Sequence, residues 1–129
     1  MKRDIDFVPV KDVFLSVVKT EEGWKVYLLN RGKQTLKNVM VTSKGYGSKD
    51  GEKQETSILR HHFEQIEFGE YALIEPINPD VFHLNNEYWV SYYIGPQIFD
   101  KKYLFVPDSI VENNLVEIPE LGLKGVLHQ

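Results

Sequence analysis

Residues 87–94 read Glu-Tyr-Trp-Val-Ser-Tyr-Tyr-Ile, and this stretch decides the fold. Alternate side chains of a strand point to opposite faces, so the stretch has two faces. One face carries Tyr88, Val90, Tyr92 and Ile94, and the other carries Trp89 and Tyr93. Aromatic and β-branched residues favour strands, and the Gly95-Pro96 pair ends the run. The pattern predicts the best-defined strand of the chain.

The composition extends this prediction to the whole chain. Its 129 residues include 14 Val, 9 Ile, 7 Tyr and 7 Phe, but only one Ala, Ala72. Alanine is the best helix former, so a helical domain of this length would rarely contain just one. The length fits a single domain. We therefore expect an all-β fold without a helix longer than two turns.

Six further apolar runs alternate with turn residues, at the spacing typical of a sandwich or barrel. They cover residues 13–18, 24–29, 36–42, 54–60, 66–74 and 103–106. Between them, residues 44–52 predict a glycine-rich polar loop, and Gly69 predicts a bulge or bend. Ser109 and Glu112 have the spacing of a capping box, which indicates one helical turn. The inter-sheet core is expected to consist of Trp24, Val26, Leu28, Val39, Val41, Tyr88, Val90 and Tyr92.

Residues 24–41 read Trp-Lys-Val-Tyr-Leu-Leu-Asn-Arg-Gly-Lys-Gln-Thr-Leu-Lys-Asn-Val-Met-Val. This segment resembles the strand-turn-strand unit of bacterial immunoglobulin-like and fibronectin-type domains. Leu84 ahead of Tyr88 is similar to a tyrosine corner, in which a Tyr hydroxyl bonds back to the chain before its strand. The resemblance covers residues 13–106 and implies a seven-stranded immunoglobulin-like β-sandwich. It implies no function, and the sheet-bridging cysteines of antibody domains are absent.

Residues 1–106 thus form the predicted sandwich, and residues 107–129 form an irregular C-terminal arm. The arm is too apolar for a solvated linker, and Pro119, Gly122 and Gly125 exclude a long helix. It must pack on its own sandwich or on a second copy. We expect a homo-oligomer, most simply a dimer, in which residues 115–127 contribute to the contact. The candidate contact residues there are Leu121, Leu123 and Leu127.

Charge and composition also bear on partners and compartment. The net charge of −4 disfavours nucleic acid and anionic membranes as partners. No apolar run approaches the length of a bilayer span. Cysteine is absent, which excludes disulfides and thiol chemistry. The first six residues hold no intact secretion signal. A cytoplasmic protein is expected, and a secreted or periplasmic chain with a trimmed leader is the alternative.

The motifs that could carry catalysis or metal binding are weak. His61, His62 and Glu64 could form a metal site together with His83, but a polar turn explains them more simply. Residues 44–51 lack the end of a phosphate loop, and no nucleophile-and-base motif occurs. We therefore expect no enzyme activity, no cofactor and no metal.

Three aromatic residues remain as candidates for binding: Tyr46 between two glycines, and Trp89 with Tyr93 on one strand. Exposed aromatic strips bind proteins, peptides or sugars. We favour the arrangement in which the C-terminal arm covers Trp89 and Tyr93. The expected function is a non-enzymatic interaction or structural module with an unknown protein partner. The alternative is a module that binds a small ligand or carbohydrate through exposed aromatics.

Overall fold

The computed structural model describes residues 9–128, and this part of the chain forms ten strands and two single 3₁₀ turns. The strands are β1 (Val13–Thr20), β2 (Gly23–Asn30), β3 (Leu36–Lys49), β4 (Glu52–Glu55), β5 (Leu59–Ile66), β6 (Tyr71–Ile77), β7 (Asn85–Ile94), β8 (Gln97–Phe105), β9 (Leu115–Ile118) and β10 (Leu123–His128). The 3₁₀ turns are η1 (Pro79–Val81) and η2 (Glu112–Asn114). The first six residues, on which the expectation about a secretion signal depends, lie outside the described range.

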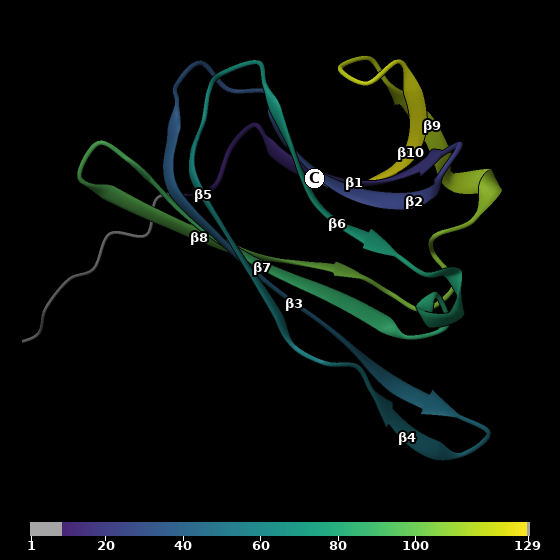
Figure 1. Ribbon diagram of the computed structural model, residues 1–129. Coiled ribbons are helices and arrows are strands. Elements are labelled where there is room, and N and C mark those ends of the chain that lie inside the picture. The colour runs from purple at the N-terminus through teal and green to yellow at the C-terminus, as the bar shows by residue number, and fades with distance from the viewer. Residues whose placement is uncertain (1–8, 129) are drawn as a thin grey trace, which may run out of the picture.

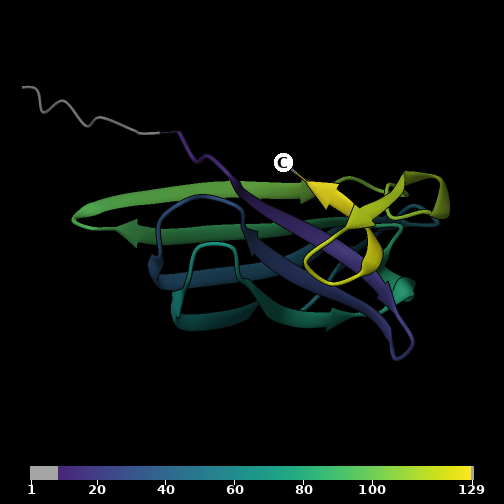
Figure 2. The same cartoon turned by 90° about the horizontal axis from the view of Figure 1, so that it is seen from above.

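The strands form two antiparallel sheets (Figure 1). The first sheet has the order β6-β2-β1-β10-β9. In the second sheet, β3 pairs with β7 on one side and with both β4 and β5 on the other, and β8 follows β7. Strands β1 and β2 run obliquely across β7 and β8 when seen from above (Figure 2). The all-β prediction is confirmed, and the arrangement is compatible with a β-sandwich.

The core lies between the inner faces of the two sheets, and the prediction of its residues is confirmed. Seven of the eight side chains expected there are buried, with relative exposures of 2% or less. The eighth, Trp24, is partly buried against the same cluster and packs edge-on against Phe82, with ring centroids 5.4 Å apart. Alternation with period two therefore identified the inward faces of β2, β3 and β7 correctly.

The expected number of seven strands is wrong, because the described residues form ten. Gly69 has a φ of +78° and lies in the turn between β5 and β6, so it separates two strands instead of bending one. The expected polar loop at residues 44–52 is largely strand, since β3 continues to Lys49 and pairs with β4. The last two additional strands, β9 and β10, come from the C-terminal arm.

The glycines of β3 serve close packing, which explains why a loop was expected there. A Cβ added at Gly45 would lie 2.9 Å from Thr56 Cγ2, and one added at Gly47 would lie 3.1 Å from Leu84 Cδ2. A glycine inside a strand often marks such a close approach. Glycines in a close-packed strand and glycines in a flexible loop give the same sequence pattern, and only the packing distinguishes the two.

The C-terminal arm is a regular hairpin, so the expectation of an irregular arm is also wrong. Strand β10 pairs with β1 of the same chain, with Val126 opposite Val17. The turn that follows β9 lies over β1 in Figure 2. Ile118 is fully buried there against Val18 and Leu29, on the face of the first sheet that points away from the core. The hairpin thus extends the first sheet and covers its outer face.

Two local predictions fail for identifiable reasons. The Tyr88 hydroxyl donates to the Glu75 carboxylate at 3.2 Å, whereas a tyrosine corner would place it on the backbone. The capping box does not form, and the Ser109 hydroxyl donates to the Val106 carbonyl at 2.6 Å. The 3₁₀ turn η2 begins later, at Glu112, and has no side-chain cap.

Candidate functional site

The outer face of the second sheet carries the aromatic residues that the sequence singled out. Trp89 is 47% exposed and Tyr93 is 38% exposed, so the expectation that the C-terminal arm covers them is wrong. The physical reason is the placement of the hairpin, which covers the first sheet. Both residues lie on β7, an inner strand of the second sheet. They therefore occupy the middle of an open sheet face.

Strand register shows which residues surround these aromatics. Across the sheet, Thr42 on β3 and Lys102 on β8 flank Trp89. Ile98, which is half exposed, is opposite Tyr93. In the row between them, Ser91 lies opposite the exposed Met40 on β3 and Asp100 on β8. We call this surface the outer face and define it by Met40, Thr42, Trp89, Ser91, Tyr93, Ile98, Asp100 and Lys102. Ser91 lies between the two aromatics at its centre, Met40 and Ile98 add apolar surface, and Asp100 and Lys102 carry charges of both signs on β8.

Tyr46 continues the same side of the sheet, but its hydroxyl already has a partner. It donates to Glu87 Oε1 at 3.2 Å, and Lys44 Nζ lies 5.6 Å from the centre of its ring. Lys44 and Lys102 also approach the Glu87 carboxylate, at 3.7 and 3.9 Å. Tyr46 is thus part of a charged cluster next to Trp89. It is half-buried and does not project alone from a loop.

The three leucines predicted for the arm have different environments. Leu121 and Leu127 pack against the buried cluster on the first sheet, within their own chain. Leu123 is 36% exposed and opens strand β10. Only Leu123 of the three is therefore free enough to contribute much area to a partner.

A second candidate site lies between the sheets, and Glu75 forms its centre. The carboxylate comes from β6 in the first sheet and accepts hydrogen bonds from the second sheet. Ser43 Oγ and His61 Nε2 both lie close to its Oε1, at 2.8 and 2.7 Å. The Tyr88 hydroxyl donates to its Oε2. Burial, and after it the negative charge of Glu75, raises the pKa of Tyr88 above its ordinary value.

A β-bulge aims Glu75 inward. Register between β2 and β6 shifts so that Val26 is opposite Glu75 while Tyr27 is opposite Leu73, which leaves Ile74 as the extra residue. The bulge reverses the alternation, so Ile74 and Glu75 both turn toward the second sheet. Simple alternation would place Glu75 on the face of the exposed Leu73. Sequence reasoning missed this residue because a bulge depends on the partner strand.

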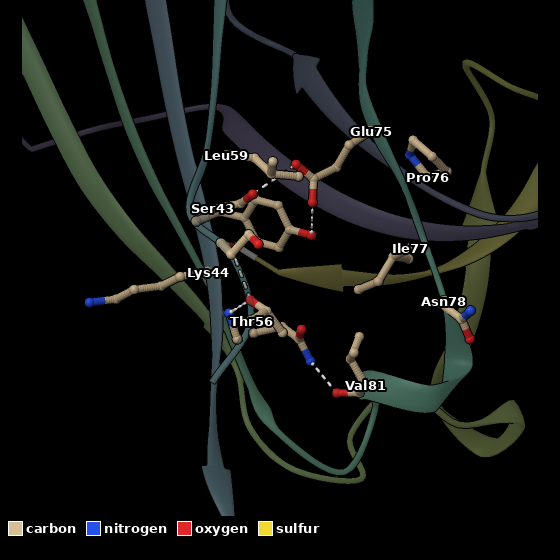
Figure 3. Close-up of a pocket in the computed structure, with 13 residues that line it drawn as sticks. Ser43, Lys44, Thr56, Leu59, Glu75, Pro76, Ile77, Asn78 and Val81 are labelled. Atoms are coloured by element: carbon tan, nitrogen blue, oxygen red, sulfur yellow. Dashed lines mark hydrogen bonds between the residues drawn. The ribbon is translucent and has the colours of Figure 1, made fainter. Parts of the chain in front are cut away.

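A cavity of about 170 Å³ lies beside this carboxylate (Figure 3). One wall comes from the interruption between β4 and β5, where Thr56 Oγ1 accepts a hydrogen bond from the Gly45 amide at 2.7 Å. The opposite wall comes from the end of β6 and from η1, and includes Ile77 and Val81. Asn86, only 5% exposed, also lines the cavity. The cavity thus combines a carboxylate, an amide and apolar walls.

The histidines considered for a metal site are dispersed. His61 contacts Glu75, while His83 Nε2 lies 2.8 Å from Gln54 Oε1. His62 is exposed and lies opposite Met40. Within residues 9–128, no three His, Asp or Glu side chains are grouped to hold a metal ion. Ser43 and His61 bind the same carboxylate oxygen, an arrangement that differs from a nucleophile paired with its base.

Comparison with known proteins adds no identity, since no protein-family model and no curated protein matches this sequence. The described residues contain no helix that is both long and apolar enough to cross a membrane.

Proposed function

We propose that this protein is a non-enzymatic interaction module that binds a protein partner through the outer face. The exposure of Trp89 and Tyr93 in the middle of a sheet face carries the proposal. Aromatic residues and Met are enriched in protein interfaces, with polar residues at the rim. The outer face has this composition, with Met40 and Ile98 beside the aromatics and with Asp100 at the margin.

Folding buries only part of the surface of these aromatic side chains. Trp89 is 47% exposed, so nearly half of its large apolar surface is left unburied by folding. The same side chain would bury its exposed part in an interface, where Trp is among the commonest residues with large binding contributions. A partner therefore accounts for a feature that the sandwich alone does not require.

A photo-crosslinking amino acid at Thr42, beside Trp89, tests this proposal in the cells that produce the protein. We expect a covalent adduct with one discrete protein, lost in Trp89→Ala and retained in Phe68→Ala. Phe68 is the matched control, because it is a 61% exposed aromatic in the turn between β5 and β6. The proposal would be contradicted if Trp89→Ala and Phe68→Ala gave equal yields of the adduct, or if the protein with Trp89 and Phe68 intact gave no adduct.

A carbohydrate or small-ligand module is the second candidate, favoured by the alignment of the two aromatics. Trp89 and Tyr93 lie four residues apart on one strand, which separates them by roughly 13 Å along a flat surface. Ser91 lies between them and offers a hydroxyl. Titration with oligosaccharides, followed by the fluorescence of Trp89 in a Trp24→Phe background, distinguishes this candidate. A saturable shift abolished by Tyr93→Ala would favour it over a protein partner.

The proposal also includes a homodimer, with a smaller contribution from the arm than the sequence indicated. Strand β9 is an edge of the first sheet, and Val116 on it is exposed, as is Leu123 on β10. An exposed edge strand can pair with its copy about a two-fold axis. These two residues are the exposed apolar residues of the β9–β10 hairpin and remain available for a second copy.

A further inference from the structure

The cavity beside Glu75 contains a hydrogen-bond acceptor without a donor. Asn86 Nδ2 donates to the Val81 carbonyl at 3.0 Å and to the Leu84 carbonyl at 3.3 Å, which fixes the orientation of the amide. Its Oδ1 accepts no hydrogen bond from any residue of the described range. This oxygen lies beside Gly45, where an added Cβ would be 3.4 Å from it. A polar side chain that is 95% buried thus directs a free acceptor toward the cavity.

Three hydroxyls that line the cavity donate elsewhere. Ser43 and Tyr88 both donate to Glu75. Thr56 donates to the carbonyl of Ser57 at 3.1 Å. The carboxylate and the free amide oxygen are acceptors, so a molecule that binds to them must bring N–H or O–H donors.

Charge restricts the ligand further. Glu75 supplies a carboxylate whose side chain is 11% exposed, and its partner His61 carries a positive charge only when protonated. The other charged residue of the lining is Lys44, whose ammonium group lies 3.7 Å from Glu87. Its side chain points away from the cavity in Figure 3. A buried carboxylate is most stable beside a positive charge that also donates hydrogen bonds.

We infer that this cavity binds a primary alkylammonium group, whose nitrogen donates to Asn86 Oδ1 in the cavity that Glu75 also lines. An ammonium head has three donors and no acceptor, which matches the free Asn86 Oδ1 and the one carboxylate lone-pair position that Ser43, His61 and Tyr88 leave unused. Its alkyl stem would lie against Ile77, Val81 and Leu59. Cavities of about 150 Å³ hold a six-atom ring such as benzene, so the volume suits the five heavy atoms of n-butylammonium. This site is separate from the outer face and independent of the function proposed for it.

Two sources share this chemistry, namely a free amine and the lysine side chain of another protein. Titrations of ¹⁵N-labelled full-length protein with n-butylammonium and with Nα-acetyl-lysine methylamide distinguish them. We expect saturable amide shifts at Gly45, Thr56 and Ile77 with n-butylammonium. Saturation by the blocked lysine as well would identify a protein lysine as an acceptable occupant, and its exclusion would restrict the site to free amines. n-Butanol, which has the same shape without the charge, should leave the amides unchanged.

Variants connect the shifts to the inferred groups. Glu75→Gln removes the charge at constant size and should weaken n-butylammonium binding at least tenfold. Glu64→Gln is the matched control, since Glu64 is an exposed glutamate on β5, and it should bind like the wild type. Gly45→Ala keeps Glu75 but places a methyl group beside Asn86 Oδ1, and it should abolish saturation.

Three results would overturn the inference. The first is the absence of saturable shifts in the wild type, which would leave the cavity as a hydrated crevice. The second is equal binding of n-butanol and n-butylammonium, which would remove the role of charge. The third is an unchanged affinity in folded Glu75→Gln or folded Gly45→Ala. Should both variants fail to fold, the comparison of the two ligands in the wild type still decides.

Discussion

Replacing Gly125 with Ala probes how the C-terminal hairpin docks on the sandwich. Gly125 is buried in β10 opposite Val18 of β1. An added Cβ would lie 2.5 Å from Ser16 Oγ, 2.9 Å from the Val17 carbonyl oxygen and 3.0 Å from Val18 Cγ2. The carbonyl belongs to a strand paired on both sides, so it cannot move without disturbing the ladder. We therefore expect the hairpin to separate from β1 or to strain it.

The magnitude follows from two contributions. Overpacking a close-packed site costs about 1–3 kcal/mol. The Ser16 hydroxyl, which donates to the Val126 carbonyl at 3.1 Å, must also rotate away and loses a buried hydrogen bond, worth roughly 1 kcal/mol. Gly125→Ala should thus lower the free energy of unfolding by about 2–4 kcal/mol. Urea denaturation followed by circular dichroism and by tryptophan fluorescence measures this change.

Two companion variants make the reasoning falsifiable. Ser16→Ala removes the closest contact, so the double variant with Gly125→Ala should be at least about 1 kcal/mol more stable than the sum of the single effects. Gly122→Ala lies in the same hairpin with a φ of +64° and no atom within 4 Å. It should cost only about 1–2 kcal/mol, through its left-handed backbone. A Gly125→Ala variant no less stable than Gly122→Ala, or strict additivity with Ser16→Ala, would refute the steric argument.

Three further predictions concern the core, the buried phenols and self-association. Leu28→Ala and Val90→Ala each remove a fully buried core side chain. Each should lower the free energy of unfolding, measured by urea denaturation, by roughly 2–4 kcal/mol. A decrease of less than about half a kcal/mol at both sites would mean that the core is wrongly assigned. Burial raises the pKa of Tyr92 to about 12 and that of Tyr88 further. The unfolded chain therefore loses its phenolic protons at lower pH than the folded chain, so the stability that is present below pH 10 should fall as pH rises from 10 toward 12. The urea midpoint, measured alongside phenolate absorbance, follows this change, and a constant midpoint would contradict the prediction. Light scattering at high micromolar concentration should give twice the mass of one chain, and Leu123→Glu should give a single chain; a monomeric wild type would exclude the dimer.

The core could be predicted from sequence because it depends on local alternation. Val26 and Leu28 share a face in any straight strand, and so do Val39 and Val41, whichever strand lies alongside. The pairing of β7 with β3, with Val90 opposite Val41, then joins faces that were already apolar. Local alternation therefore predicts the inward face of a strand segment that contains no β-bulge.

The cavity site could not be predicted, because its geometry depends on contacts between distant segments. Glu75 turns inward through a bulge against β2, about fifty residues earlier in the chain. Gly45 gives a loop signal until Thr56 and Asn86 are placed beside it. Neither property is encoded within a window of ten residues. The candidate aromatic site was partly predictable. The sequence predicted the face on which Trp89 lies, whereas its exposure depends on where the hairpin packs.

The two sheets differ in how their outer faces are covered, and this difference leaves one aromatic face exposed. Val18 and Leu29 point away from the core, yet both are fully buried, because the hairpin brings Ile118 over them. The second sheet has a comparable supply of apolar side chains on its outer face, including Trp89, but no described segment covers them. Within residues 9–128, the C-terminal arm pairs with β1 through β10. The outer face could not offer such a pairing, because β7 is already paired on both sides. The geometry of strand pairing therefore leaves the aromatic face open to another molecule.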